Sequence, residues 1–194
     1  IGLYTSYFSK LAGQNGKVHS FEPDVTNFKN FKKVTAKLSN VVGNHSAVSD
    51  SNVPLKIYTS HRLNVDHRTY PVDEYSTSYE VPATSIDAYV NGKYKVDIVK
   101  MDIQGAEYPA LVGMKQTLQS NPHLILFMEI CPSALRDFGV EMKTIHQFLS
   151  SLGYSIFDYS MHRIEEAELK KYDSYADDAF ENVIIAKNIP QLSA

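Results

Sequence analysis

Two acidic side chains follow predicted strands, and they are the residues of this sequence best suited to chemistry. Asp102 follows the apolar run that begins at Val96, and Glu22 ends the shorter run that begins at Lys17. A carboxylate can accept hydrogen bonds from two hydroxyl groups at once, or take the proton from one of them. Open α/β sheets bind ligands at the carboxyl ends of their strands, so both positions are candidate ligand contacts.

The stretch 96–107 reads V-D-I-V-K-M-D-I-Q-G-A-E and predicts a buried parallel strand, a small-residue turn and a helix that starts near Ala106. Pro109 supports this start, because proline is tolerated in the first turn of a helix. Asp102 and Glu107 are the two candidates for removing the proton from a hydroxyl nucleophile. Each has a structural alternative: Asp102 as the cap of the helix, and Glu107 as a favourable charge near its N-terminus.

Glu22 is the candidate for binding a nucleotide. An acidic residue at the end of the second strand of a nucleotide-binding sheet can bind both ribose hydroxyls. The alternative is an ordinary surface carboxylate at the end of a strand. Gly2 precedes a predicted helix, which is where a nucleotide-binding unit has its glycine-rich turn, and only the end of such a turn is present.

The elements that must position these residues alternate between strand and helix along the chain. Alternation of this kind predicts an α/β fold with a parallel sheet that is covered by helices on both faces. The last two strands are expected to pair antiparallel. The predicted strands are Lys17–Glu22, Asn40–Ser49, Val53–Tyr58 (returning as a hairpin), Val81–Thr84, Val96–Asp102, Leu124–Glu129, Tyr154–Tyr159 and Asn182–Lys187.

The predicted helices have recognisable apolar faces and end signals. Asp24 or Thr26 is expected to cap the second helix, Ser85 or Asp87 lies near the start of a short one, and Pro132–Phe138 forms another that ends at Gly139. The expected apolar faces are Leu3, Tyr4, Tyr7, Phe8 and Leu11; Phe28, Phe31, Val34 or Thr35, and Leu38; Leu111, Met114 and Leu118; and Met142, Ile145, Phe148, Leu149 and Leu152.

Composition limits the classes of protein that remain. The 194 residues suit a single domain over 1–194, and a net charge of −3 gives no argument for nucleic acid or a membrane as partner. The single cysteine makes a reducing, cytoplasmic location the default. The polar stretch 59–80 is expected to be a loop, and the spacing of His61 and His67 within it matches no compact zinc pattern, so no metal site is expected.

Six segments, in order, carry a resemblance to a known family. They are G-L-Y-T at 2–5, V-H-S-F-E-P at 18–23, A-V-S-D at 47–50, T-S-I-D at 84–87, K-M-D-I-Q-G-A-E at 100–107 and M-E-I-C-P at 128–132. Together they resemble the FkbM-type family of S-adenosylmethionine-dependent methyltransferases. The resemblance covers nearly the whole chain, and F-E-P together with D-x-x-G-A-E forms its more specific pair.

The resemblance implies a class I methyltransferase (Rossmann-like) fold with seven strands, mostly parallel, of which the last is antiparallel. It implies that S-adenosylmethionine is the cofactor and that Glu22 binds its ribose. Gly2 would end the cofactor loop, and His45, Ser46 and Ala47 would lie beside the adenine. Asp102 would lie next to the sulfonium and the acceptor.

This chain departs from the family pattern in two ways. The glycine-rich D-x-G-A-N loop that precedes the Ile-Gly pair is absent, and so is the first strand, which predicts an N-terminally truncated domain. The family often has Glu where this chain has Gln104, so the resemblance gives position 104 no role as a base or metal ligand.

The function predicted from the sequence is methylation of an oxygen on a sugar, glycan or other small molecule. The first alternative is a nicotinamide-dependent oxidoreductase, which would need G-x-G-x-x-G ahead of the first helix. The second is a non-catalytic Rossmann-like fragment. The sequence specifies neither the acceptor nor the oligomeric state.

Overall fold

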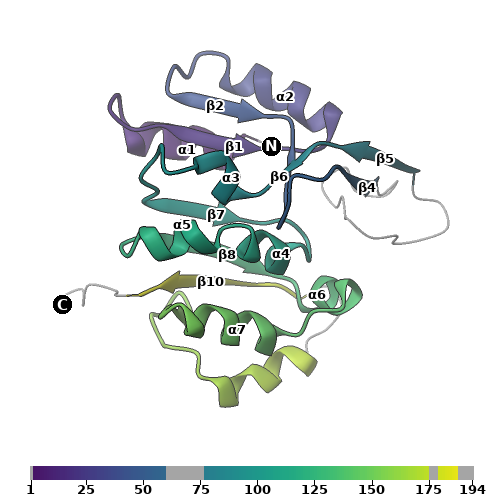
Figure 1. Ribbon diagram of the computed structural model, residues 1–194, viewed down its shortest axis with the longest axis vertical. Coiled ribbons are helices and arrows are strands. Elements are labelled where there is room, and N and C mark those ends of the chain that lie inside the picture. The colour runs from purple at the N-terminus through teal and green to yellow at the C-terminus, as the bar shows by residue number, and fades with distance from the viewer. Residues whose placement is uncertain (1, 60–76, 175–178, 188–194) are drawn as a thin grey trace. The chain divides into compact units, whose positions relative to one another are not determined.

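The computed structural model describes residues 2–59, 77–174 and 179–187, and its chain divides into two compact units. The first unit is Ile1–Thr84 and the second is Ser85–Ala194. Figure 1 labels the elements of both units, and each unit is considered by itself. A single domain over 1–194 therefore stays a prediction.

A parallel pair of strands begins the sheet structure of the first unit. Strand β1 (Val18–Phe21) pairs with β2 (Val41–Asn44), and helix α2 (Val25–Thr35) connects them. Asp24 is the N-cap of α2, as predicted, and its Oδ1 accepts a hydrogen bond from the backbone N–H of Asn27 at 2.6 Å. This β-α-β connection brings the carboxyl ends of both strands to the same edge.

Helix α1 (Leu3–Ala12) forms where predicted, but its expected apolar face is wrong. The buried residues are Thr5 and Ser9, whose hydroxyl groups bond Ser20 Oγ at 2.9 Å and Asn40 Oδ1 at 2.6 Å. These polar contacts decide which side of the helix faces inward, since each buried hydroxyl finds a partner there. The side chains left exposed are Leu3, Tyr4, Tyr7 and Leu11.

The predicted strand over 40–49 is two strands. After β2 the chain turns away, and β3 (Ala47–Val48) pairs in parallel with β6 (Ala83–Thr84). Strand β4 (Leu55–Thr59) is not a hairpin return on the preceding strand, because it pairs antiparallel with β5 (Thr77–Val81). The core of this part of the unit consists of Ala47, Ile57, Val81 and Ala83.

Both ends of the polar loop expected at 59–80 belong to strands. Thr59 belongs to β4, and residues 77–80 belong to β5. Residues 60–76, which include His61 and His67, lie outside the described part of the chain.

The second unit contains one mixed sheet with the order β7-β8-β10-β9. Strand β7 (Ile98–Met101) runs parallel to β8 (Ile125–Ile130). Strand β10 (Glu181–Ala186) pairs antiparallel with both β8 and β9 (Ser155–Phe157), so the predicted antiparallel pairing of the last two strands is confirmed.

Figure 1 shows α4, α5 and α7 over one face of this sheet. The predicted apolar face of Leu111, Met114 and Leu118 is fully buried, but the chain breaks between two helices at Gly113 and Met114. The helical elements of the unit are α3 (Ile86–Val90), α4 (Glu107–Val112), α5 (Lys115–Ser120), α6 (Pro132–Phe138), α7 (Met142–Ser151) and a 3₁₀ helix over Glu166–Ser174.

Strand β7 is less buried than predicted. It lies at an edge of its sheet, and the side chain of Ile98 is 47% exposed. In β8, by contrast, Leu126, Met128 and Ile130 alternate with half-buried residues and are themselves completely buried. An edge strand pairs on one side only, which explains the difference between two similarly apolar sequences.

The α/β class is thus present, in sheets that are small and mixed. Within the described residues the strands form three two-stranded sheets and one four-stranded sheet. The arrangement of these strands in a single class I sheet stays a prediction.

Candidate functional site

In the first unit, the structure places Glu22 beside the segment 45–47. Phe21 and Asn44 are register partners at the ends of β1 and β2, so the residues that follow them lie at the same edge. The N–H of Glu22 donates to the carbonyl oxygen of Asn44 at 3.1 Å. Glu22 is half-buried, and its Oε1 accepts the N–H of Asp24 at 3.0 Å. Two of the predicted cofactor contacts are therefore neighbours.

An aromatic stack borders this edge. The ring of His45 lies on that of Phe28, with centroids 5.0 Å apart and planes 15° apart. The Nε2 atom of His45 is 3.0 Å from the carbonyl oxygen of Pro23, so this hydrogen bond joins the ends of β1 and β2. A flat surface of this kind next to a carboxylate suits a nucleoside, whose base stacks and whose ribose hydroxyls donate hydrogen bonds.

Ser46 and Ala47 are fixed by hydrogen bonds to Pro82, the residue before β6. The Ser46 hydroxyl donates to the carbonyl oxygens of Pro82 at 3.1 Å and Ala47 at 3.0 Å, and the Ala47 N–H also donates to Pro82 at 2.9 Å. The side chain of Ala47 belongs to the buried core. Only the backbone of Ala47 is therefore suited to contact a cofactor.

Tyr79 adds a contact that the sequence did not indicate, because it lies in the expected loop. Its hydroxyl donates to Asp24 Oδ2, while Asp24 Oδ1 caps α2. Burial, followed by this hydrogen bond, raises the pKa of Tyr79 to about 12. Tyr79 therefore stays a hydrogen-bond donor at neutral pH, and it fixes the loop that follows Glu22.

Gly2 is the N-cap of α1 in a left-handed conformation, with φ of +76°. A Cβ at this position would lie 3.1 Å from a side-chain atom of Val34. The left-handed conformation favours glycine here, and a larger residue would also crowd the Val34 side chain. This geometry is compatible with the end of a glycine-rich turn.

In the second unit, a polar row crosses the carboxyl ends of β7 and β8. Met101 and Met128 are register partners, so Asp102 and Glu129 follow as the next pair. Asn182 of β10 is the register partner of Glu129 on the other side. Register partners point to the same face of a sheet, which brings these three polar side chains together.

Two further side chains connect this row. Gln104 Nε2 donates to Asp102 Oδ1 at 3.2 Å, and Lys100 Nζ donates to Asn182 Oδ1 at 3.4 Å. Burial, and then the negative charge of Asp102, raise the pKa of Glu129, while Lys100 opposes the shift. Asp102 itself is exposed. The row thus presents one accessible carboxylate with a second, less acidic carboxyl group beside it.

Glu107 lies next to this row but is 1% exposed. Its Oε1 accepts the backbone N–H groups of Gly105 at 3.2 Å and Ile103 at 3.4 Å. Burial raises the pKa of Glu107 to about 7 despite these hydrogen bonds. The N-cap of α4 is Ala106, without a side-chain hydrogen bond, so the alternative role of Asp102 as the cap of this helix is wrong.

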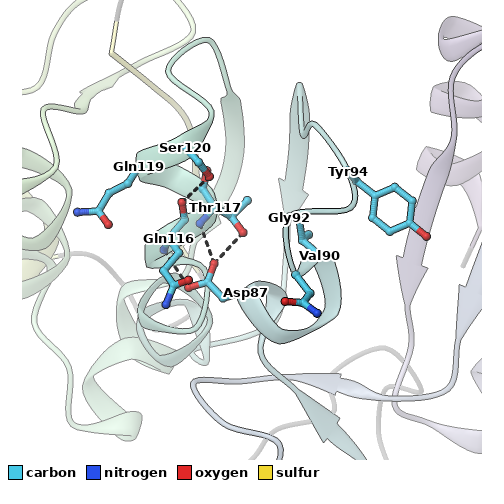
Figure 2. Close-up of a pocket in the computed structure, with 9 residues that line it drawn as sticks. Asp87, Val90, Gly92, Tyr94, Gln116, Thr117, Gln119 and Ser120 are labelled. Carbon is cyan, nitrogen blue, oxygen red and sulfur yellow. Dashed lines mark hydrogen bonds between the residues drawn. The ribbon is translucent and has the colours of Figure 1, made fainter.

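A separate hollow lies between α3 and α5, where Figure 2 shows its lining. Asp87 is on its wall, but both carboxylate oxygens are occupied. They accept the backbone N–H groups of Gln116 at 2.8 Å and Thr117 at 2.7 Å, and the Thr117 hydroxyl at 2.7 Å. Asp87 therefore caps α5 from a neighbouring helix, and the hollow contains none of the predicted site residues.

The described residues contain no group of three or more His, Cys, Asp or Glu side chains that could hold a metal ion.

Among those same residues, no helix is both long enough and apolar enough to cross a membrane.

The sequence identified part of this constellation. It placed Glu22 and Asp102 at strand ends and Glu107 near the start of the following helix, and it noted Glu129 only as a carboxylate that ends the neighbouring strand. Asn182 and Lys100 were missed, because their position depends on the pairing of β8 with β10 and on the face to which β7 points. Side chains two residues apart on a strand point to the same face, so the strand predicted over 96–102 already placed Lys100 on the face of Asp102. This was the signal that could have added Lys100 to the candidate site.

The comparison with known protein families gives the family of the chain. The sequence matches the methyltransferase FkbM domain over residues 1–156. The chain belongs to the FkbM methyltransferase domain family.

A solved structure with a similar fold is the methyltransferase FkbM from Methylobacillus flagellatus KT. The match has a TM-score of 0.50 at 15% sequence identity, and it covers 87% of this chain and 36% of that chain. The present chain thus spans little more than a third of that protein. No curated protein sequence matches the chain.

Proposed function

We propose that this protein is an S-adenosylmethionine-dependent methyltransferase that acts on a hydroxyl group of a sugar, glycan or other small molecule. The observation that supports this most directly is membership of the FkbM methyltransferase family over residues 1–156. No observation favours the nicotinamide-dependent oxidoreductase that the sequence left open.

The first unit has residues that fit the nucleoside part of the cofactor. The carboxylate of Glu22 accepts the two ribose hydroxyls, since it is half-buried and lies at the end of β1. His45 and Ser46 follow the adjacent strand and border the adenine. Gly2 has the left-handed conformation that the end of a glycine turn requires.

The second unit has residues that fit the reacting end. Bound S-adenosylmethionine would supply a methyl group on a sulfonium sulfur, with the thioether as the leaving group. The exposed carboxylate of Asp102 accepts the proton that the acceptor hydroxyl loses, so charge is balanced. Its negative charge also favours a cationic cofactor nearby.

Gln104 and Glu129 are the polar neighbours of the Asp102 carboxylate. The Gln104 amide donates to Asp102 and fixes its orientation at 3.2 Å. Glu129 lies beside Asp102 at the end of the neighbouring strand, and burial and the charge of Asp102 raise its pKa. The two carboxyl groups side by side offer several hydrogen-bond acceptors to a hydroxyl-rich substrate.

Replacement of Glu22 tests the cofactor assignment. Glu22→Gln keeps the size of the side chain and removes its charge, so S-adenosylmethionine binding should weaken by roughly 10- to 100-fold, the range for hydrogen bonds to a charged group. Titration calorimetry measures this, and Glu80→Gln is the matched control, because Glu80 is an exposed glutamate on β5 of the same unit.

Equal affinities for Glu22→Gln and wild type would contradict the ribose assignment. Binding of NAD in place of S-adenosylmethionine by the wild-type protein would overturn the methyltransferase proposal as a whole.

A further inference from the structure

The carboxyl group of Glu107 bonds back to the turn that connects β7 to α4. Glu107 is the first residue of α4, and its Oε1 accepts the N–H groups of Ile103 and Gly105. Because the side chain is buried, these two hydrogen bonds are shielded from water and contribute more than exposed ones would. One atom of Glu107 thus holds two backbone positions of the turn.

The second carboxyl oxygen has no such role. Glu107 Oε2 is buried and has no hydrogen-bond partner among the described residues. Burying an oxygen without a hydrogen-bond partner costs free energy. A carboxylate that only had to place a negative charge at the N-terminus of α4 could do so while exposed to solvent. The burial of Glu107 is therefore better explained by the two hydrogen bonds that Oε1 accepts from the turn.

The turn that Oε1 holds is strained. Gln104 has φ of +53°, which is uncommon for a residue other than glycine, and Gly105 has φ of +97°. A Cβ at Gly105 would lie 2.6 Å from the carbonyl oxygen of Ala134 in α6. Such backbone conformations persist only where the surroundings fix them, and here the fixed groups are Glu107 on one side and α6 on the other.

The strained residue is the one that contacts Asp102. The Gln104 amide donates to Asp102 Oδ1, so the φ angle of Gln104 determines where its side chain meets the exposed carboxylate. Loss of the hydrogen bonds from Ile103 and Gly105 to Glu107 would allow Gln104 to return to an ordinary conformation and leave Asp102.

We propose that Glu107 is a positioning residue for Asp102: it fixes the 103–105 turn through Oε1, and the turn presents Gln104 to the Asp102 carboxylate. This replaces the expectation that Glu107 is itself catalytic. The inference rests on the proposed function only in treating Asp102 as the proton acceptor. The turn geometry stands independently.

Two variants separate this role from a favourable charge at the helix N-terminus. Glu107→Gln removes the charge but keeps an oxygen that can accept both N–H groups. Glu107→Met keeps the length of the side chain but has no such oxygen. If Glu107 acted only through its charge, the two variants would loosen the 103–105 turn equally. The positioning role predicts that Glu107→Gln keeps the turn fixed and that Glu107→Met does not.

The measurement is amide hydrogen exchange of Ile103 and Gly105 by NMR in the full chain, together with the side-chain NH₂ signal of Gln104. In Glu107→Met both amides should exchange at least roughly tenfold faster, and the Gln104 signal should move toward that of a free amide. In Glu107→Gln exchange should stay within about threefold of wild type. Leu118→Ala is the control, since it empties a buried site in α5, a different helix from the one that Glu107 begins.

The proposal would be overturned if the amides of Ile103 and Gly105 exchanged equally fast in Glu107→Met and Leu118→Ala. It would also be overturned if they exchanged equally fast in Glu107→Met and Glu107→Gln. If Glu107→Met does not fold, Glu107→Gln decides alone: tenfold faster exchange in that variant contradicts the positioning role, and wild-type exchange supports it. Failure of the wild-type protein to bind S-adenosylmethionine would remove the proposed function without altering the exchange result.

Discussion

Glu107 differs from the carboxylates of the polar row, Asp102 and Glu129, because it is almost completely buried and its pKa is raised to about 7. Its pKa of about 7 arises from burial, with a smaller contribution from the charge of Asp102. A raised pKa means that the folded protein binds a proton which the unfolded chain, with a pKa near 4.5, has already released. The protonation of this one side chain therefore links the stability of the protein to pH.

This linkage gives a prediction with a defined sign. The stabilisation from Glu107 is fully present below pH 4.5, decreases as pH rises through the window to 7, and is lost above it. The shift corresponds to about 3 kcal/mol in the free energy of unfolding. Urea unfolding of wild type and Glu107→Gln at several pH values measures it, and the difference between the two proteins should change by that amount between pH 4.5 and 8.

Glu107→Gln should also be the more stable protein at pH 8, because it buries an uncharged amide where the wild type buries a charge. A constant difference between the two proteins across this pH range would show that the pKa of Glu107 is the same in the folded and unfolded protein, and would exclude the linkage.

At the scale of the elements, short helices depend on partners outside themselves. Helix α5 has only six residues, too few to be stable alone, and its N-cap Met114 makes no side-chain hydrogen bond. Asp87 supplies the missing acceptors from α3, as the dashed lines in Figure 2 show. The T-S-I-D segment thus has a structural function in addition to its place in the family pattern.

Asp87→Ala should therefore destabilise the protein by about 1–3 kcal/mol, because it leaves two backbone N–H groups of α5 and the hydroxyl of Thr117 without their acceptor. Chemical denaturation measures the change. Asp97→Ala is the matched control: Asp97 is exposed, and its ion pair with Lys95 lies at the surface, so its loss should cost less than about 0.5 kcal/mol. Similar losses in both variants would disprove the capping role.

The sequence predicted most elements because their signals are local. The cap at Asp24, the proline and glycine that bound α6, and the glycine that ends α7 are decided within a few residues. Pairing is not local. Nothing within 40–49 indicates that β3 leaves β2 to pair with β6, some thirty-six residues away by register. The polar row across β7, β8 and β10 depends on the same long-range pairing, which is why Asn182 was missed.

The inward face of α1 shows a second limit of prediction from sequence. Periodicity assigns the apolar side to the interior, but two hydroxyl groups on the other side find partners in Ser20 and Asn40. A residue-by-residue pattern cannot foresee partners that come from elements further along the chain. The hydrophobic pattern alone was therefore correct for the helix and wrong for its orientation.

At the scale of the whole molecule, cofactor binding should appear as a gain in thermal stability. A ligand present at a hundred times its dissociation constant adds about 2.7 kcal/mol to the native state. For a chain of this length that corresponds to a rise in Tm of roughly 5–10 °C. S-adenosylmethionine and S-adenosylhomocysteine should both produce it in a thermal-shift experiment, and NAD should not. Unchanged Tm values with both nucleosides would contradict the proposed function.

Strand β10 fills the gap between β8 and β9, although it is the last strand of the described chain to be synthesised. On a translating ribosome, β8 and β9 therefore emerge before the strand that joins them, and neither can pair across that gap until β10 has left the exit tunnel. Until then, the edge of β8 that pairs with β10 stays unpaired. Nascent chains of this protein should consequently be substrates for chaperones until β10 has left the exit tunnel.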